Sequence, residues 1–225
     1  MNKALTAVAA IAVGALGWTS IANANPIIGG TYNLWNALTS GQSGTNQQGG
    51  PDNSIISGPH QLVTNGSYTG PINFNLQAPA HNETNSTIGD FLASDSSPFG
   101  QTGCNSNCLG TTLSQGSFHQ VSLFEFTFNV GAGGENLSVL NDDGVSLFEH
   151  GHTTNLFGAG SEDPTANGSN FATLAAGSYD LWYAEANGDP AVLQTNVPEP
   201  ATIAIFGSAL IGLGALRRRR RRDVA

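Results

Sequence analysis

Hydrophobic and polar residues alternate along several stretches in the second half of the chain. The clearest case is Ser122–Val130, where three phenylalanines and Val130 occupy every second position and polar residues occupy the others. A period of two is typical of a β-strand that buries one face. The same pattern predicts strands at 72–76, 178–186 and 191–197, and a β-hairpin over 136–149 whose turn is the run Asn-Asp-Asp-Gly at 141–144.

Short strands separated by Gly, Asn and Asp turns predict an all-β fold, either an antiparallel β-sandwich or a jelly roll. No long amphipathic helix competes with this prediction between the two ends of the chain, and only residues 88–93 suggest a turn or two of helix. The apolar segment 31–38 stays unassigned, and the Gly- and Gln-rich residues 41–51 are typical of a linker or loop. We therefore expect a loop-rich part at 25–117 and the sandwich at 118–197.

The N-terminus has the three parts of a secretory signal peptide. A single basic residue, Lys3, precedes an apolar run over 4–18, and small residues follow before a polar one. This pattern predicts a signal peptide over 1–24, cleaved between Ala24 and Asn25. The two cysteines then lie in an oxidising compartment, and three residues separate Cys104 from Cys108. That spacing does not fit a redox motif, and no further thiolate or histidine pair completes a zinc site, so we expect a small disulfide.

The C-terminal end combines an apolar segment with a cluster of positive charge. Residues 201–216 carry no charge, and at about 1.5 Å per residue they span roughly 24 Å, against about 30 Å for a bilayer core. Lipid thinning and long basic side chains offset such a shortfall. We expect a transmembrane helix over 201–216, with everything before it outside. The segment is held by a cytoplasmic stop made of Arg217, Arg218, Arg219, Arg220, Arg221 and Arg222.

A rigid tripeptide, Pro198-Glu199-Pro200, precedes the apolar segment. Together with the apolar segment and the arginine cluster, it resembles the PEP-CTERM protein-sorting signal of Gram-negative bacteria, over 198–222. The resemblance implies that a membrane protease, exosortase, recognises Pro198, Glu199 and Pro200 and cuts near them. The product is then released from an inner-membrane, single-pass intermediate to the cell surface or the exopolysaccharide matrix. A permanent single-pass anchor is the alternative.

A second resemblance concerns residues 118–197. The stretches FEFTFNVGAGGENLSVLNDDGVSLFEHG and FATLAAGSYDLWYAEANGDPAVLQTNV are similar to the bacterial pre-peptidase C-terminal type of β-sandwich. The shared features are an upstream pattern of alternating apolar residues and a "TLAAGSYDL" turn and strand. This resemblance implies the same fold class as the alternation. No protease domain precedes the module, so the module itself would be the exported protein.

Charge excludes several functions for the exported residues 25–197. All seven Lys and Arg residues lie outside this region, whereas fourteen of the sixteen acidic residues lie inside it. Its formal charge is therefore −14 at pH 7. Nucleic acid is therefore excluded as a partner, because neutralising phosphates requires Lys or Arg. Arginine recognition of phosphate groups is absent for the same reason. An acidic surface suits divalent cations.

The sequence contains no established catalytic arrangement, and we predict no catalytic residue, no cofactor and no fixed metal site. The acidic run around Gly144 is compatible with a calcium site, whose candidate oxygen ligands are Asp142, Asp143 and Glu149. The alternative is an ordinary polar turn. His150 and His152 would share one face of a strand, but a third metal ligand is not identifiable.

The sequence thus predicts an exported, non-enzymatic adhesion or structural protein. We expect exosortase and extracellular polysaccharide as its partners, and contact with the membrane through the C-terminal helix. Two other functions stay open: a secreted glycan hydrolase with two acidic residues at its active site, and a calcium-dependent carbohydrate-binding module.

Overall fold

The computed structural model describes residue 27 and residues 30–38, 48–56, 62–76, 86–94, 101–115 and 120–195. All of them belong to one compact unit, Pro26–Val197. The predicted signal peptide with its cleavage site, the Pro-Glu-Pro motif, the helix over 201–216 and the arginine cluster lie outside the described residues. Within the described ranges, no helix has the length and apolar character needed to cross a bilayer.

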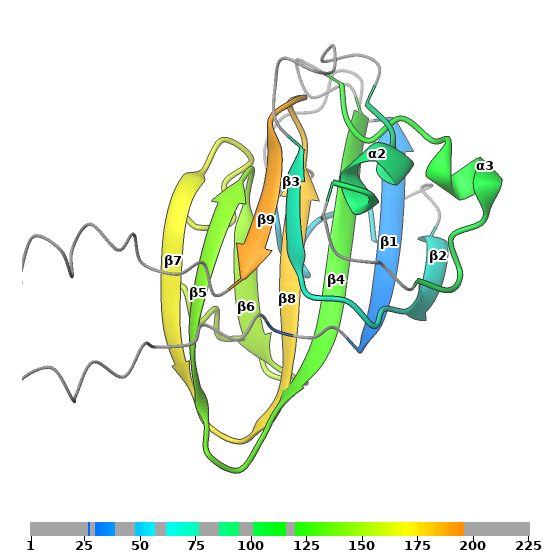
Figure 1. The fold of residues 1–225 in the computed structure, drawn as a ribbon. Helices are drawn as coiled ribbons and strands as arrows, with labels where there is room; N and C mark the ends of the chain where they lie inside the picture. Colours follow the sequence, from blue (N-terminus) through cyan, green and yellow to red (C-terminus); the bar gives the residue numbers. More distant parts are fainter. Residues whose placement is uncertain are drawn as a thin grey trace, which may run out of the picture. The chain divides into compact units, whose positions relative to one another are not determined.

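Two antiparallel sheets face each other, which confirms the predicted all-β sandwich (Figure 1). The five-stranded sheet has the order β2-β1-β4-β8-β6, and the four-stranded sheet has the order β3-β9-β5-β7. The strands of the first sheet are β2 (Leu62–Ser67), β1 (Thr31–Leu38), β4 (Gln120–Val130), β8 (Gly177–Glu185) and β6 (Val145–Glu149). Those of the second are β3 (Asn73–Leu76), β9 (Ala191–Thr195), β5 (Glu135–Asp142) and β7 (Asn167–Leu174).

The main core lies between the sheets and is rich in aromatic rings. Phe124, Phe126 and Phe128 of β4 are at most 1 % exposed, as the alternation predicted, whereas Glu125 and Thr127 lie on the outer face. Across the core, Phe126 packs on Phe74 of β3 with 5.9 Å between ring centroids. Each fully buried Phe side chain contributes about 2–3 kcal/mol to stability.

A second apolar cluster covers part of the outer face of the five-stranded sheet. Trp35 of β1 stacks on Trp182 of β8 with 5.5 Å between ring centroids. Ile55, from residues 48–56, packs on this cluster and is 1 % exposed. The segment 48–56, next to the predicted linker, therefore closes a small core of its own.

Two short helices flank the sandwich. In α2 (Ile88–Leu92), Thr87 and Asp90 form a capping box, and Phe91 is buried in the main core. The helix α3 (Ser106–Leu109) follows Cys104, which forms the expected disulfide with Cys108, with 5.2 Å between their Cα atoms. The bridge fixes a compact loop beside β2.

The two ends of the described chain meet at the edge of the four-stranded sheet. The Ile27 backbone N–H donates to Oγ1 of Thr195, the last residue of β9, at 3.2 Å. The Ile72 N–H donates to the Ile27 carbonyl oxygen at 3.0 Å, and the Thr195 N–H donates to the Ile72 carbonyl oxygen at 2.9 Å. These three buried residues join the first and last described residues.

Residues 25–117 supply β1, β2 and β3 to the same two sheets as the later strands. The predicted hairpin over 136–149 is wrong, because β5 pairs with β7 and β9, whereas β6 pairs with β8 in the other sheet. The run Asn-Asp-Asp-Gly is thus a corner between sheets, and its buried polar side chains bond to the interior.

Candidate functional site

The corner between β5 and β6 carries two consecutive acidic residues, joined by a cis peptide bond, at the end of the sandwich where β8 turns into β9. Asp142 ends β5 and is partly exposed, whereas Asp143 is completely buried. Gly144 completes the corner, since a Cβ there would lie 2.5 Å from the Glu162 carbonyl oxygen. The sequence therefore turns sharply inward at this point and carries the Asp143 carboxyl group with it.

The Asp143 carboxyl group is only half satisfied by its surroundings. Its Oδ2 accepts hydrogen bonds from the backbone N–H groups of Ala186 and Asn187, at 3.0 and 3.2 Å. Its Oδ1 is buried and accepts no hydrogen bond from an N–H or O–H donor of the described residues. The Asp142 carboxyl group adjoins it closely enough for the two side chains to share a proton. Burial raises the pKa of Asp143 to about 8 despite the two N–H donors, and the neighbouring Asp142 carboxylate adds to the rise.

A third carboxyl group, that of Glu185, lies next to this pair at the end of β8. Glu185 is fully buried, and its oxygens lie 2.9 Å from Ser114 Oγ and 2.7 Å from the Tyr183 hydroxyl. Burial raises the pKa of Glu185 well above its usual value. The single Tyr183 hydroxyl proton also faces the Asp142 carbonyl oxygen. The Tyr183 hydroxyl group, which donates to Glu185 Oε2, thus connects Glu185 to the corner at Asp142.

Asp142, Asp143 and Glu185, here called the carboxyl cluster, have no Lys or Arg partner within residues 25–197, which contain neither residue type. Burial also raises the pKa of Asp142. An unpaired carboxylate oxygen in such a place is costly unless a proton or a cation compensates for it. Oxygen donors of this kind suit a hard divalent cation such as Ca²⁺.

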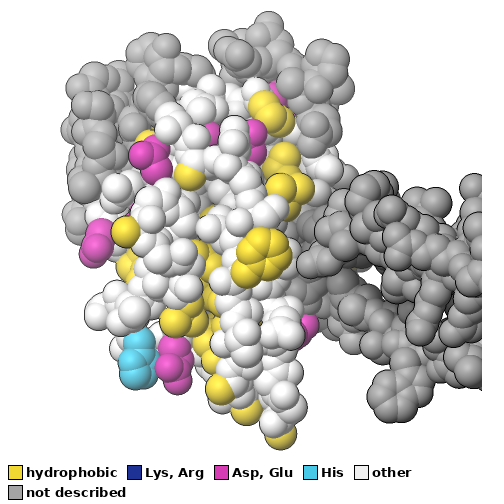
Figure 2. Space-filling model, turned by 90° about the vertical axis from the view of Figure 1, so that its left-hand side faces the viewer, with side chains coloured by type: hydrophobic (Ala, Val, Ile, Leu, Met, Phe, Trp, Pro, Cys, Tyr) yellow, Lys and Arg dark blue, Asp and Glu magenta, His cyan; other side chains and the backbone are white. Residues whose placement is uncertain are grey.

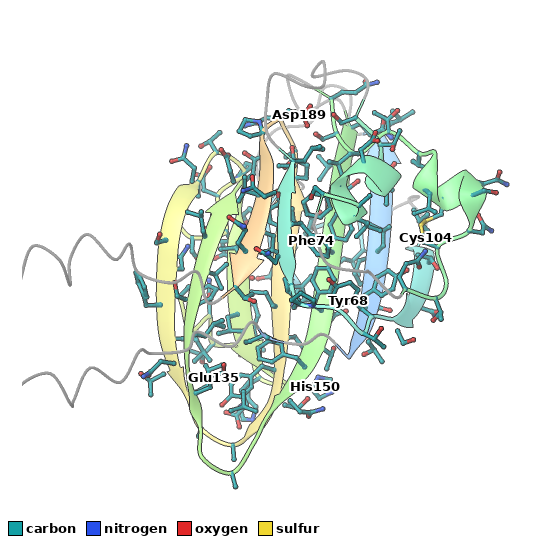
Figure 3. The ribbon with its side chains drawn as sticks, viewed as in Figure 1. Tyr68, Phe74, Cys104, Glu135, His150 and Asp189 are labelled. Carbon is teal, nitrogen blue, oxygen red and sulfur yellow. A yellow bond between two sulfur atoms is a disulfide. The ribbon has the colours of Figure 1, made fainter. Side chains whose placement is uncertain are left out.

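The other ligand predicted from sequence does not lie near this pair. Glu149 is exposed at the opposite end of β6 from the corner, about 13 Å away along the strand. Figure 3 places Asp189, in the β8–β9 turn near the carboxyl cluster, and His150, next to Glu149, at opposite ends of the sandwich. Among the described residues, no three His, Cys, Asp or Glu side chains are arranged to hold a metal ion.

Sequence reasoning identified Asp142 and Asp143 but missed Glu185, Tyr183 and Ser114. The sequence did contain a signal for Glu185. Leu181, Tyr183 and Glu185 are alternate residues of β8, so the period of two places their side chains on the same, inner face. No sequence signal indicated Ser114, which reaches Glu185 from 71 residues earlier in the chain.

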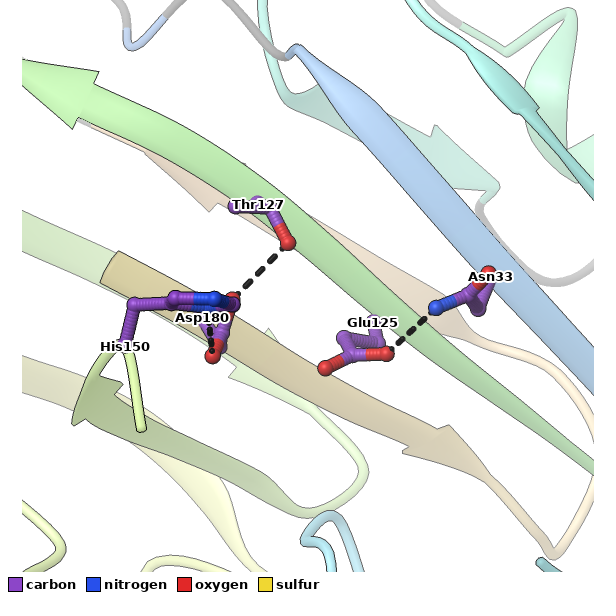
Figure 4. A network of polar contacts seen from close by, with 5 residues as sticks. All are labelled: Asn33, Glu125, Thr127, His150 and Asp180. Carbon is purple, nitrogen blue, oxygen red and sulfur yellow. Dashed lines mark hydrogen bonds and ion pairs between the residues drawn. The ribbon is translucent and has the colours of Figure 1, made fainter. Parts of the chain in front are cut away.

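A separate polar network lies on the outer face of the five-stranded sheet (Figure 4). His150 Nδ1 lies 2.8 Å from Asp180 Oδ2, and Thr127 donates to the other Asp180 oxygen at 2.8 Å. Asn33 donates to Glu125 at 2.7 Å, and burial, followed by repulsion from Asp180, raises the pKa of Glu125. His152 does not join this network, so the two histidines predicted to share a face share no ligand.

Comparison with known proteins identifies one sequence motif. Residues 196–221 match the PEP-CTERM protein-sorting motif, as the sequence predicted. The motif implies an exported protein that exosortase processes. The resemblance of 118–197 to the pre-peptidase C-terminal sandwich stays a prediction. No curated protein matches the chain.

Solved structures give distant likenesses. A PA14 sugar-binding domain from an RTX adhesin has 13 % identity and a TM-score of 0.41, covering 75 % of this chain and 87 % of that chain. The PA14 domain of an antifreeze protein has 16 % identity and a TM-score of 0.38, covering 76 % and 81 %. A GH31 α-xylosidase from Xanthomonas citri has 9 % identity and a TM-score of 0.25, covering 62 % of this chain and 17 % of that chain. Likenesses at these scores assign no activity.

Proposed function

We propose that this exported protein is a non-enzymatic adhesion or exopolysaccharide-associated protein, whose sandwich holds glycan through a calcium ion bound by Asp142 and Asp143. The sorting motif supports the extracellular destination. After exosortase processing near Pro198, Glu199 and Pro200, the sandwich would remain in the polysaccharide matrix. Export of an acidic domain without basic side chains supports a polysaccharide partner rather than a nucleic acid.

The observation that carries the proposal is the buried Oδ1 of Asp143, which accepts no N–H or O–H donor other than a proton shared with the adjoining Asp142 carboxyl group. Burying this carboxyl pair without a basic partner destabilises the fold, and such groups persist where a ligand satisfies them. The Asp142 carboxyl group adjoins it and is partly exposed, which gives a cation a path from solvent. A divalent cation would compensate both for the burial that raises the pKa of Asp143 and for the smaller repulsion from Asp142.

The small number of protein ligands supports a role in binding glycans. Calcium takes six to eight oxygen ligands, and two aspartates supply only part of this shell. Backbone oxygens, water and vicinal sugar hydroxyl groups would fill the other positions. Asp143 and Glu185 are closed off by protein, whereas a glycan hydrolase requires two carboxyl groups that both reach the substrate. This difference supports binding over hydrolysis.

The proposal is tested by titrating calcium into the processed protein in a calorimeter and by probing a glycan array with and without calcium. We expect heat on calcium addition and glycan binding that chelation removes. Asp142→Asn should abolish both, whereas Glu149→Gln, a change at an exposed residue at the other end of β6, should leave both intact. Calcium binding that survives Asp142→Asn would remove this site, and glycan binding unaffected by chelation would remove the role of the ion.

A further inference from the structure

The four edge strands of the two sheets are β2, β6, β3 and β7. An edge strand presents backbone N–H and C=O groups that have no partner within the sheet, and it therefore tends to pair with another chain. Proteins usually cover such edges with loops, helices or charged side chains. The four edge strands of this sandwich differ in whether another segment of the chain covers them.

Two edges are covered by segments beside the helices. On β2, the Ser67 N–H donates to Thr102 Oγ1 at 3.1 Å, and the Thr102 N–H donates to the Ser67 carbonyl oxygen at 3.0 Å. The disulfide loop that begins at Cys104 follows directly. On β3, the Asn75 N–H donates at 2.9 Å to Oγ of Ser94, just after α2. Both edges therefore have intramolecular partners.

The β6 edge is covered by the long loop that follows it. The Val145 N–H donates to the Ser161 carbonyl oxygen, and the Leu147 carbonyl oxygen accepts from the Leu156 N–H, both at 2.8 Å. The Leu147 N–H donates to Asn155 Oδ1 at 3.2 Å. This loop replaces a neighbouring strand along most of β6.

The β7 edge differs from the other three. It is eight residues long, pairs with β5 on one side, and shows no backbone hydrogen bond on its other side within the described part of the chain. Its sequence, NGSNFATL, contains no charged residue and no proline, and Phe171 is 65 % exposed. Figure 1 shows β7 at the outer margin of its sheet, and Figure 2 shows hydrophobic side chains on this side of the molecule.

We propose that β7 pairs in antiparallel fashion with β7 of a second copy of this chain and joins the two four-stranded sheets into one. A register centred on Phe171 pairs residues 168–174 with their copies and places the two Phe171 rings opposite each other on one face. β7 carries no charged side chain with which a charged partner could form an ion pair. Two copies of an uncharged strand meet without like charges opposite each other, although the domain as a whole is strongly acidic.

The covered edges determine the size of the assembly. A twofold pairing uses the same strand from both copies and leaves only β2, β3 and β6 at the margins. These three have intramolecular partners, so pairing stops at a dimer and does not continue into a fibre. The dimer would present two carboxyl clusters, although its formation does not depend on their function.

The test measures the mass of the processed protein by light scattering between about 1 and 100 μM, without added calcium. We expect a mass that rises twofold to that of a dimer, and slow hydrogen exchange of β7 amides that depends on protein concentration. Phe171→Lys should give a folded monomer, because two lysines then oppose each other. Leu38→Lys is the matched control, since Leu38 is 66 % exposed but lies on β1, and it should leave the dimer intact.

Several outcomes would overturn the proposal. A wild-type protein that stays monomeric at every concentration would do so, as would a dimer that persists in a correctly folded Phe171→Lys variant. Open-ended assemblies would rule out the twofold pairing. Protection of β7 amides only after a different protein is added would show that the edge serves another partner. Circular dichroism of each variant establishes that it is folded before its mass is interpreted.

Discussion

Replacing Asp143 with Asn should stabilise the protein in the absence of calcium. The buried carboxyl group has a pKa of about 8 in place of its usual 3.8. The folded state therefore retains a proton that the unfolded state releases above about pH 4. Stability falls by about 1.4 kcal/mol for each pH unit between about pH 4 and 8, and at pH 7 the loss is about 4 kcal/mol.

An asparagine at this position removes that loss and keeps most of the hydrogen bonds. Its amide oxygen accepts from the Ala186 and Asn187 N–H groups as Asp143 Oδ2 does. Its amide N–H₂ group lies at the position of Oδ1, beside the Asp142 carboxyl group, and an imperfectly paired buried donor costs about 1–3 kcal/mol. The net gain at pH 7 is about 1–3 kcal/mol, which corresponds to a rise of about 2–12 °C in Tm for a domain of this size.

The assay is thermal unfolding of the processed protein from pH 5 to 8 in a chelator, repeated with calcium. Wild-type Tm should fall with rising pH in the chelator, and calcium at about a hundred times its Kd should restore about 2.7 kcal/mol. Asp143→Asn should show a higher, flatter profile and no response to calcium. Glu149→Gln, at an exposed residue at the other end of β6, should behave as wild type. Wild-type stability that is constant or rises from pH 5 to 8 would refute the argument from burial.

Three further changes test other parts of the structure. Phe91→Ala, which leaves a cavity where α2 packs on Phe124 and Tyr183, should cost about 3–5 kcal/mol in denaturant unfolding. Cys104→Ser should cost less than about 3 kcal/mol, because the closed loop is short, and its unfolding midpoint should equal that of the reduced wild type. Replacing residues 198–200 with alanines should keep the chain attached to the membrane, because exosortase would no longer recognise it. The intact mass of the released wild-type protein should show that it ends before the apolar segment 201–216. A released protein that retains the arginine cluster would contradict exosortase processing.

The sequence predicted β4 and β8 well because every second side chain of these central strands points into the main core. In β4 the residues between them are partly exposed from Glu125 onward, whereas in β8 the outer face is also buried from Asp180 to Ala184, where the cluster around Trp182 covers part of it. β7 was missed for the opposite reason: it is an edge strand, most of its side chains are exposed, and its polar sequence shows no period of two. Edge strands are specified by the neighbour with which they pair, which local sequence does not contain.

The corner at Asp142–Asp143 shows a similar limit for the site. Turn residues predict that the chain reverses there, but they do not determine which strands it connects. The choice between a hairpin and a crossing depends on interior contacts, in which Asp143 bonds to Ala186 and Asn187 and Asn141 bonds to the Ala166 carbonyl oxygen. The acidic pair was therefore visible in the sequence, whereas its burial beside Glu185 was not.

The hydrogen bond between Ile27 and Thr195 has a consequence for engineering this fold. Chain ends that touch can be joined by a few residues with little loss of loop entropy, so the unit should tolerate circular permutation. The turn at 131–134 is a suitable place for new ends, since it is exposed and a Cβ at Gly131 or Gly133 would meet no neighbour within 4 Å. The same adjacency would let the whole sandwich be inserted into a surface loop of an unrelated carrier protein, where it would be displayed without disturbing its host.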